Sequence, residues 1–212
     1  MLFEDRARSV SDGEQIGVLG GTFDPVHNGH IAIARAAREH AALDRVLFVV
    51  SARPPHKRSG PYASSEDRYA MVQAALEGQP GMAPSRLEVE RDGPSYTVDT
   101  LKKLDALCPG AELYLILGMD SLCDLPKWRD MRGILQRASL LVVPRPGKWV
   151  CPRELEGRFE LLPMEEMDIS STEIRRRIFD GDSIDGLVPL AVEQMIRQQG
   201  IYDACRTDAS RS

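Results

Sequence analysis

The chain has 212 residues, of which 42% are hydrophobic and 28% are charged, and its formal net charge is −5. These values are typical of one globular domain with a sizeable core, and the negative charge argues against a general nucleic-acid-binding protein. Four cysteines lie far apart, without a Cys-x-x-Cys pair, and fit neither a zinc site nor a disulfide framework. No apolar run is long enough to span a membrane and no apolar signal core is visible, so we expect a cytoplasmic protein with no membrane or nucleic-acid partner.

Strand-like and helix-like segments alternate along the chain. Short apolar runs predict strands over residues 16–19, 46–50, 113–117, 140–143 and 159–162, and alternation of apolar and polar residues predicts one over residues 86–90. Helical periodicity predicts helices over residues 29–40, 65–77, 97–107, 171–179 and 189–198, and a short helix that ends at 134–137. This alternation predicts right-handed crossovers and an α/β fold with a doubly wound, mostly parallel sheet, whose ligands bind at the carboxyl ends of the strands.

The predicted elements fall within one domain, residues 15–202. The preceding residues, 1–14, are polar and charged, and we expect a flexible N-terminal extension there. The last residues, 203–212, read Asp-Ala-Cys-Arg-Thr-Asp-Ala-Ser-Arg-Ser and are expected to form a disordered tail.

The most informative segment is residues 20–30, Gly-Gly-Thr-Phe-Asp-Pro-Val-His-Asn-Gly-His, between the first strand and the first helix. Free backbone N–H groups and the dipole at a helix start favour an anion. Gly20 and Gly21 let the backbone approach a ligand closely, while His27 and His30 can donate to phosphate oxygens and are cationic if the site raises their pKa. Each feature alone also fits an ordinary turn or a surface histidine, but the combination favours a phosphate site.

A second candidate phosphate element is Asp-Ile-Ser-Ser-Thr-Glu-Ile-Arg, late in the chain. Ser170 and Glu173 predict a capping box that fixes the start of a helix. Ser171, Thr172 and Arg175 then lie close together at that helix start, where hydroxyls and a guanidinium could hold a polyphosphate. The alternative is a well-capped surface helix whose arginines are solvated.

These two segments resemble the signatures of one enzyme superfamily. His-Asn-Gly-His at 27–30 is similar to the His-x-Gly-His signature of nucleotidyltransferases, and Ile-Ser-Ser-Thr-x-Ile-Arg resembles their second signature in its bacterial nicotinate-mononucleotide adenylyltransferase form. Three further segments resemble that family: Pro-Pro-His-Lys at 54–57, Pro-Ser-Tyr-Thr-Val-Asp-Thr-Leu at 94–101, and Leu-Gly-Met-Asp-Ser followed by Leu-Pro-Lys-Trp within 117–128. The similarity spans about residues 16–202 and implies a Rossmann-like nucleotidyltransferase fold.

The resemblance implies an enzyme that transfers AMP from ATP to nicotinate mononucleotide, giving deamido-NAD and pyrophosphate in NAD biosynthesis. It implies catalytic roles for His27, His30 and Arg175. The ATP-binding residues that it implies are Gly20, Gly21, Thr22, Phe23, His30, Ser171, Thr172 and Arg175, with Gly118 and Asp120 on the nucleoside side. Mg²⁺ would bind mainly through ATP phosphates and water, with no ligand from protein side chains.

The same resemblance implies an acceptor site around Trp128. Its indole would stack on the nicotinate ring, and backbone N–H groups near Thr97 and Arg129 would hold the nicotinate carboxylate. A core position is the alternative for Trp128, although its charged neighbours favour partial exposure. Arg129 stands where many relatives carry an aromatic residue, and its guanidinium could supplement the carboxylate contact or face solvent. His56 and Lys57 could touch phosphate, and a solvated loop fits them equally well.

Other functions share parts of this pattern. Adenylyl transfer to phosphopantetheine, or cytidylyl transfer to an alcohol phosphate, uses the same histidine turn but lacks the Ser-Tyr-Thr and Trp pairing. A non-catalytic nucleotide-binding regulator would keep the fold, but the intact histidine pair and Arg175 argue against it. Asp24 is interpreted as structural, because a carboxylate repels a triphosphate unless a metal intervenes. The expected partners are the two nucleotide substrates, and the expected assembly is a monomer or a small homo-oligomer.

Overall fold

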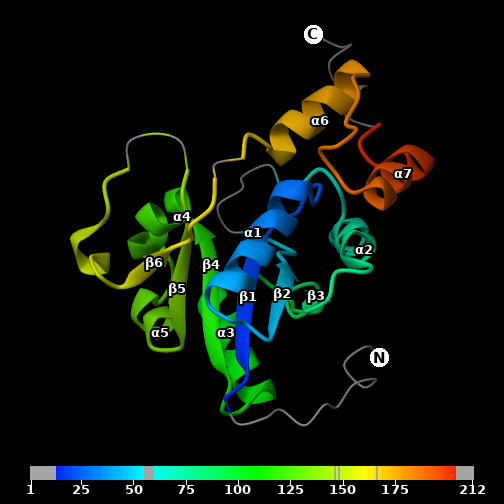
Figure 1. The fold of residues 1–212 in the computed structure, drawn as a ribbon. Coiled ribbons are helices and arrows are strands. Elements are labelled where there is room, and N and C mark those ends of the chain that lie inside the picture. Colours follow the sequence, from blue (N-terminus) through cyan, green and yellow to red (C-terminus); the bar gives the residue numbers. More distant parts are fainter. Residues whose placement is uncertain (1–12, 55–59, 146, 148, 166, 204–212) are drawn as a thin grey trace.

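The computed structural model describes residues 13–54, 60–145, 147, 149–165 and 167–203, which form an α/β fold around one six-stranded sheet (Figure 1). The strands are β1 (Gln15–Gly21), β2 (Arg45–Val50), β3 (Met82–Ser85), β4 (Glu112–Gly118), β5 (Ala138–Val143) and β6 (Phe159–Leu161). Their order is β3-β2-β1-β4-β5-β6, and every neighbouring pair is parallel. The predicted doubly wound parallel sheet is confirmed, and its direction of winding reverses between β1 and β4.

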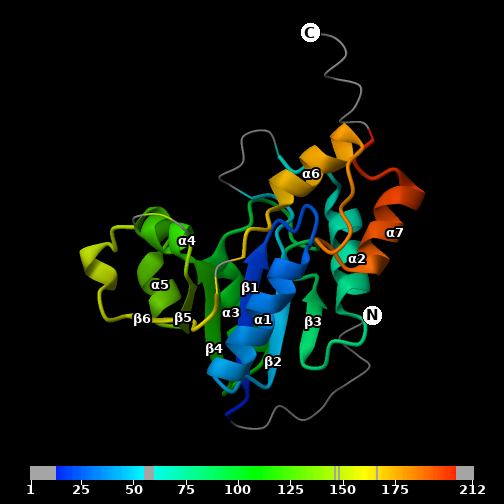
Figure 2. The ribbon, with the colours of Figure 1, turned by 45° about the horizontal axis from the view of Figure 1, so that its top comes forward.

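Helices cover both faces of the sheet (Figures 1 and 2). The helices are α1 (Asn28–His40), α2 (Ser65–Leu76), α3 (Thr97–Leu107), α4 (Met119–Asp124), α5 (Met131–Leu135), α6 (Ser171–Asp180) and α7 (Leu190–Gln199), with short 3₁₀ turns η1 (Leu125–Lys127) and η2 (Arg153–Leu155). Buried residues of α1, α2, α6 and α7 form one hydrophobic cluster, and those of α3, α4 and α5 form another on the opposite face.

The central strands contribute to both clusters, as the apolar run over β2 predicts. Val46, Phe48 and Val50 belong to the cluster of α1 and α2, whereas Leu47 and Val49 belong to the cluster of α3. Successive side chains of a strand point to opposite faces, so a strand that is covered on both sides needs apolar residues throughout.

Two short stretches differ from the prediction. The strand expected over residues 86–90 is wrong: the strand is β3, and a turn follows in which the Glu90 N–H donates to the Arg86 carbonyl at 3.0 Å. Leu87 and Glu88 are buried as consecutive residues, which a half-exposed strand does not allow. The second stretch is α4 and η1, which the prediction misses because they are too brief to give a periodic signal. The short helix α5 ends at Leu135, within the predicted range 134–137.

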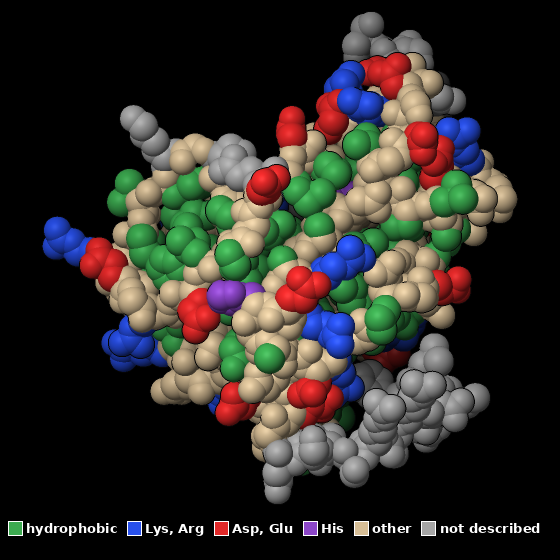
Figure 3. Space-filling view, in the orientation of Figure 1, with side chains coloured by type: hydrophobic (Ala, Val, Ile, Leu, Met, Phe, Trp, Pro, Cys, Tyr) green, Lys and Arg blue, Asp and Glu red, His purple; other side chains and the backbone are tan. Residues whose placement is uncertain are grey.

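The residue just before β1 is attached to the neighbouring strands of the sheet. The Glu14 carbonyl accepts from the Glu112 N–H, and the Glu14 carboxylate lies 3.0 Å from Arg45 Nε, so residues just before β1 are joined to the sheet. Residues 1–12 and 204–212 lie outside the described part of the chain. Hydrophobic side chains gather over the region of β6, the edge strand of the sheet, whose Leu161 is exposed (Figure 3). No helix among the described residues is long and apolar enough to cross a membrane.

Candidate active site

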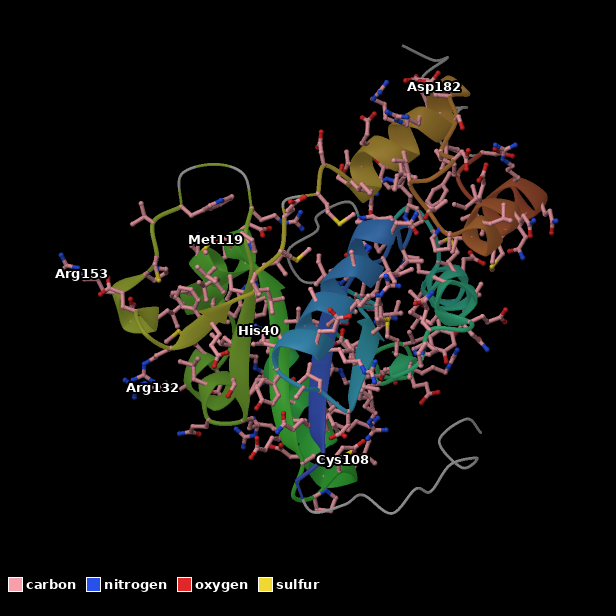
Figure 4. The ribbon with its side chains drawn as sticks, viewed as in Figure 1. His40, Cys108, Met119, Arg132, Arg153 and Asp182 are labelled. Atoms are coloured by element: carbon pink, nitrogen blue, oxygen red, sulfur yellow. The ribbon has the colours of Figure 1, made fainter. Side chains whose placement is uncertain are left out.

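A cavity of about 300 Å³ lies at the carboxyl ends of β1 and β4, where the winding of the sheet reverses. Figure 4 shows Met119, which directly follows β4, at this end of the molecule and Cys108, which precedes β4, at the opposite end. The predicted residues that line the cavity are Gly20, Gly21, Thr22, His30, Thr97, Gly118, Asp120, Trp128 and Arg129. The structure therefore brings the expected phosphate turn and the expected acceptor residues to one cavity.

The two histidines of the first signature stack on each other. Their ring centroids are 3.6 Å apart. The rings of Phe23 and His30 are in an edge-to-face arrangement, with their centroids 4.9 Å apart. His30 Nδ1 accepts a hydrogen bond from the His27 backbone N–H at 3.2 Å. Because Nδ1 is an acceptor, neutral His30 carries its proton on Nε2. His30 thus offers an N–H donor at the wall of the cavity.

Both histidines are uncharged at neutral pH. Burial lowers the pKa of His27 to about 4, and the Arg145 guanidinium acts in the same direction. Burial, with smaller contributions from His27 and Arg145, holds the pKa of His30 well below its usual value. The site lowers the pKa of both histidines and does not raise it, so the expected possibility of cationic histidines is wrong. The histidines serve as neutral hydrogen-bonding groups.

Arg145 supplies a positive charge at the cavity and has no place in the sequence prediction. It follows β5 closely, lines the cavity, and its Nε lies 3.9 Å from Asp120 Oδ1. It also lines a small hollow of about 20 Å³ beside His27. A basic residue at the carboxyl end of a buried parallel strand was the available signal, because ligands bind at that edge of such sheets.

The helix of the second signature begins at Ser171, as predicted, but its capping box is only half formed. The Ser170 hydroxyl accepts from the Glu173 N–H at 3.2 Å. The Glu173 carboxylate does not return to the cap and instead accepts from Arg176 and Arg177, which hold its pKa at about 2. Two cations three and four residues ahead on the helix outcompete one backbone N–H for a single carboxylate.

Side chains of α6 bind the backbone of the phosphate turn, at Asp24 and Pro25, and do not line the cavity. Arg175 Nη1 donates to the Asp24 carbonyl at 2.6 Å, and the Ser171 hydroxyl donates to the Pro25 carbonyl at 2.8 Å. Arg175 Nη2 also lies 3.3 Å from the Thr172 hydroxyl. The two predicted phosphate elements are thus adjacent, with α6 placed beyond the carboxyl ends of the strands (Figures 1 and 2).

Asp24 holds this turn in place, as its structural interpretation predicts. The residue is buried, and its Oδ1 accepts from the Tyr202 hydroxyl at 3.0 Å and from the Ala63 N–H at 3.1 Å. Its Oδ2 accepts from the Tyr62 N–H at 2.9 Å. Burial and the Asp24 carboxylate raise the pKa of Tyr202, so its hydroxyl remains a donor. One carboxylate therefore ties the turn to the segment just before α2 and to the segment that follows α7.

Phe23 is placed under the phosphate turn and not on the cavity wall. Its side chain is buried and packs against Phe48 with ring centroids 5.5 Å apart. Its backbone has a φ of +49°, in the left-handed region. A Cβ on Gly21 would lie 2.9 Å from the Phe23 ring, closer than such contacts allow. Glycine is therefore required at position 21 for the turn to close over this ring.

The acceptor half of the cavity is formed by the start of α3 and the segment after η1. Trp128 is half-buried, which confirms its expected partial exposure. Thr97 is the first residue of α3, where backbone N–H groups lack intrahelical acceptors. The Arg129 guanidinium lies 4.8 Å from the Tyr96 ring centroid and 3.7 Å from the Asp99 carboxylate. Arg129 therefore covers Tyr96 at the mouth of the cavity.

Glu88 is a buried carboxylate on the cavity wall that the sequence prediction misses. The Thr100 hydroxyl donates to it at 2.6 Å, which fixes the residue against α3. Its signal is hidden because it stands in the stretch wrongly assigned to a strand. His56 and Lys57 lie outside the described residues, so their loop contacts stay predictions. Within the described chain no group of three or more His, Cys, Asp or Glu side chains could hold a metal ion.

Comparisons with known proteins give the family and the fold of the chain. The cytidylyltransferase-like family model matches residues 18–177. A probable nicotinate-nucleotide adenylyltransferase of Thermus thermophilus is 47% identical over 190 residues, covering 89% of this chain and 99% of that protein, and one of Gloeobacter violaceus is 42% identical over 200 residues, covering 90% and 97%. In fold, the chain is similar to a Plasmodium falciparum nicotinic acid mononucleotide adenylyltransferase complexed with NaAD, with a TM-score of 0.75, 20% identity, and coverage of 90% of this chain and 98% of that one.

Proposed function

The chain belongs to the nicotinate-nucleotide adenylyltransferases, within the cytidylyltransferase-like family, and from this premise we propose that it transfers AMP from ATP to nicotinate mononucleotide. The products are deamido-NAD and pyrophosphate, an activity of NAD biosynthesis. One observation carries the proposal: the phosphate turn with His30 and the acceptor residues Thr97 and Trp128 line the same cavity. A cavity built this way can hold both reactants with their reacting phosphates next to each other.

The reaction needs positioning and charge stabilisation more than a covalent nucleophile. A phosphate oxygen of the acceptor attacks the α-phosphorus of ATP, a new P–O bond forms, and the bond to pyrophosphate breaks on the opposite side. His30 Nε2–H and the N–H groups of Thr22 and Phe23 donate to phosphate oxygens as charge develops. His27 stacks on His30 and fixes its ring orientation and tautomer.

Positive charge for the phosphates comes from groups other than the histidines. We propose that Ser171, Thr172 and Arg175 hold the β- and γ-phosphates, because they lie against the Asp24–Pro25 backbone at the edge of the turn. Mg²⁺ would be carried mainly by the phosphates and water, because this ion keeps several water ligands and binds phosphate oxygens. When bound, Mg²⁺ neutralises charge on the phosphate oxygens.

The acceptor is recognised by a flat ring site and backbone donors. The Trp128 indole offers a face for the electron-poor pyridine ring, and the N–H groups at Thr97 and Arg129 offer donors for its carboxylate. Gly118 and Asp120, where β4 passes into α4, form the nucleoside side of the cavity. We also propose that the protein works in the cytoplasm, as a monomer or a small homo-oligomer.

Product analysis with different acceptors tests the proposal. ATP and Mg²⁺ are supplied with nicotinate mononucleotide, nicotinamide mononucleotide or phosphopantetheine in turn, and pyrophosphate release and the dinucleotide product are measured. We expect rapid release with nicotinate mononucleotide. Release only with phosphopantetheine would replace the acceptor, and ATP binding without pyrophosphate release from any acceptor would indicate a regulator instead of an enzyme.

A further inference from the structure

Arg68 is a buried arginine of α2 that binds backbone carbonyl groups of the loops around the phosphate turn. The residue is 1% exposed and does not line the cavity. Its Nη1 donates to the Thr22 carbonyl at 2.6 Å and to the Ser51 carbonyl at 2.7 Å. Its Nε donates to the Ala63 carbonyl at 3.1 Å, and its Nη2 donates to the Ala52 carbonyl at 3.4 Å. One side chain thus joins the ends of β1 and β2 to the start of α2.

The partners of this guanidinium are neutral. Among the described residues no carboxylate lies within 4.0 Å of Arg68, and burial lowers its pKa while the more distant Asp24 raises it. Burying a charge against carbonyls alone carries a large desolvation penalty, so fold stability is a weak reason for an arginine here. The charge does polarise the peptide groups that it binds, and this polarisation strengthens the N–H donors on their far sides.

The contact with Thr22 fixes the direction of the next N–H group. In a planar trans peptide the carbonyl oxygen and the following N–H point in opposite directions. Thr22 lines the cavity, and its carbonyl points toward the buried Arg68 guanidinium. The Phe23 N–H therefore points away from Arg68, and within the described chain no backbone group accepts a hydrogen bond from it.

The backbone at Phe23 needs such support. Its φ of +49° is in the left-handed region, which a large side chain rarely adopts unless its surroundings impose it. Phe48 holds the ring, and Arg68 holds the preceding carbonyl. We propose that Arg68 is a positioning residue that keeps the Phe23 N–H aimed at the triphosphate and strengthens it as a donor. This inference rests on the proposed function, which places a triphosphate in the cavity.

The sequence carries a faint signal for this role. Arg68 shares the buried face of α2 with Met71, Val72 and Ala75, at helical spacing. A charged residue in the middle of an apolar helix face has to be satisfied inside the protein, so its position points to fixed polar partners.

Kinetics of two variants test the role. Arg68→Met keeps much of the volume and removes every donor, and Arg68→Lys keeps the charge but loses the planar fork. We expect kcat to fall roughly 10²-fold in Arg68→Met, as for the loss of one preorganised donor, and less in Arg68→Lys. The KM for ATP should rise, while the KM for nicotinate mononucleotide should stay near the wild-type value. Arg45→Met, at the opposite end of the sheet, is the matched control and should keep wild-type kinetics.

The Phe23 amide gives a direct readout that a general loss of stability does not move. In ¹⁵N-labelled wild-type protein, its resonance should shift on titration with pyrophosphate, and this shift should be much smaller in Arg68→Lys and Arg68→Met. If Arg68→Met does not fold, Arg68→Lys decides the question. The proposal would be overturned if the Phe23 amide shifted with pyrophosphate as much in the Arg68 variants as in wild type. It would also be overturned by an equal rise in KM for both substrates, or by the same loss of kcat in Arg45→Met. If wild-type protein makes no dinucleotide, the proposed function fails, yet the pyrophosphate titration still tests Arg68.

Discussion

Arg175 donates from Nη1 to the backbone carbonyl of Asp24 at 2.6 Å, across 151 positions of sequence. The helix of the second signature is therefore joined to the phosphate turn through a backbone carbonyl. A change of side chain at position 24 would not remove this acceptor. The Arg175 guanidinium also lies 4.6 Å from the Tyr62 ring centroid, and its side chain is mostly buried. Its position is set before any nucleotide binds, so little entropy is lost when a phosphate reaches it.

Removal of this guanidinium should weaken binding of the leaving group selectively. In Arg175→Ala we expect affinity for ATP and pyrophosphate to fall roughly 10- to 100-fold, the range for a lost charge-assisted hydrogen bond. Binding of nicotinate mononucleotide should be nearly intact, because we propose its pocket at Trp128 and α3, which line the cavity. Isothermal titration with each ligand measures the difference. Arg176→Ala is the matched control, since Arg176 is exposed and paired with Glu173 and Asp180. An equal loss for the acceptor would place Arg175 elsewhere in the mechanism.

His30 should be required for turnover through one nitrogen. His30→Ala removes the Nε2–H donor and should lower kcat by roughly 10²-fold or more, with the fold unchanged. His30→Gln places an amide N–H near the position of Nε2, so it should retain more activity than His30→Ala. Steady-state kinetics on both variants, with circular dichroism to check folding, decide the question. A wild-type rate in folded His30→Ala would remove the histidine from the phosphate site.

The lowered histidine pKa should make stability fall in mild acid. His27 has a pKa of about 4 in the folded protein and an ordinary value near 6.5 when unfolded, so the unfolded chain binds more protons between these pH values. The contribution of His27 to the free energy of unfolding is therefore constant above pH 6.5. It decreases as the pH falls from there toward 4, by about 1.4 kcal/mol per pH unit. Between pH 7 and pH 5 we expect a loss of roughly 2 kcal/mol from His27 alone.

Urea unfolding at these two pH values measures this effect. His27→Gln should lose less stability than wild type on going from pH 7 to pH 5, by about 2 kcal/mol. His40→Gln is the control, because His40 lies on the surface beside Glu160 (Figure 4). An identical pH dependence in wild type and His27→Gln would mean that His27 is not buried as a neutral group.

The parts of the site that the sequence predicts are those formed by neighbouring residues. The glycines and histidines of residues 20–30 act through a single turn and helix start, and the continuous apolar run of β2 reports its burial on both faces. Contacts that join distant segments leave no local pattern. Tyr202 reaches Asp24 across 178 positions, and nothing near either residue shows the pairing.

The charge state of the site also depends on the assembled fold. A histidine at a helix start has an ordinary pKa in an open chain, and only its burial beside Arg145 lowers it. Glu88 and Arg145 reach the cavity from a turn and from a strand end that are separated in sequence. Their joint position follows from the order of strands in the sheet and not from any motif.

The choice of acceptor should depend on Trp128 and on the start of α3. In the proposed binding mode the nicotinate carboxylate gains charge-assisted hydrogen bonds from the N–H groups at Thr97 and Arg129. An amide would offer one acceptor oxygen and turn its NH₂ group toward those donors. Unpaired buried donors give on the order of 10²-fold discrimination, so nicotinate mononucleotide should be used much more efficiently than nicotinamide mononucleotide. The wild-type ratio of kcat/KM for the two acceptors measures this preference.

Trp128→Ala should then reduce kcat/KM for nicotinate mononucleotide without changing the affinity for ATP. The half-buried indole lines the cavity and is the proposed face for the nicotinate ring, so its loss would remove stacking while the donors at α3 remain. Trp128→Phe keeps a smaller aromatic face and should give an intermediate value. The N–H donors, and not the ring face, distinguish the carboxylate of nicotinate mononucleotide from the amide of nicotinamide mononucleotide. The preference for nicotinate mononucleotide should therefore persist in both variants. Equal efficiency for the two mononucleotides in wild type would show that the carboxylate does not bind at the start of α3.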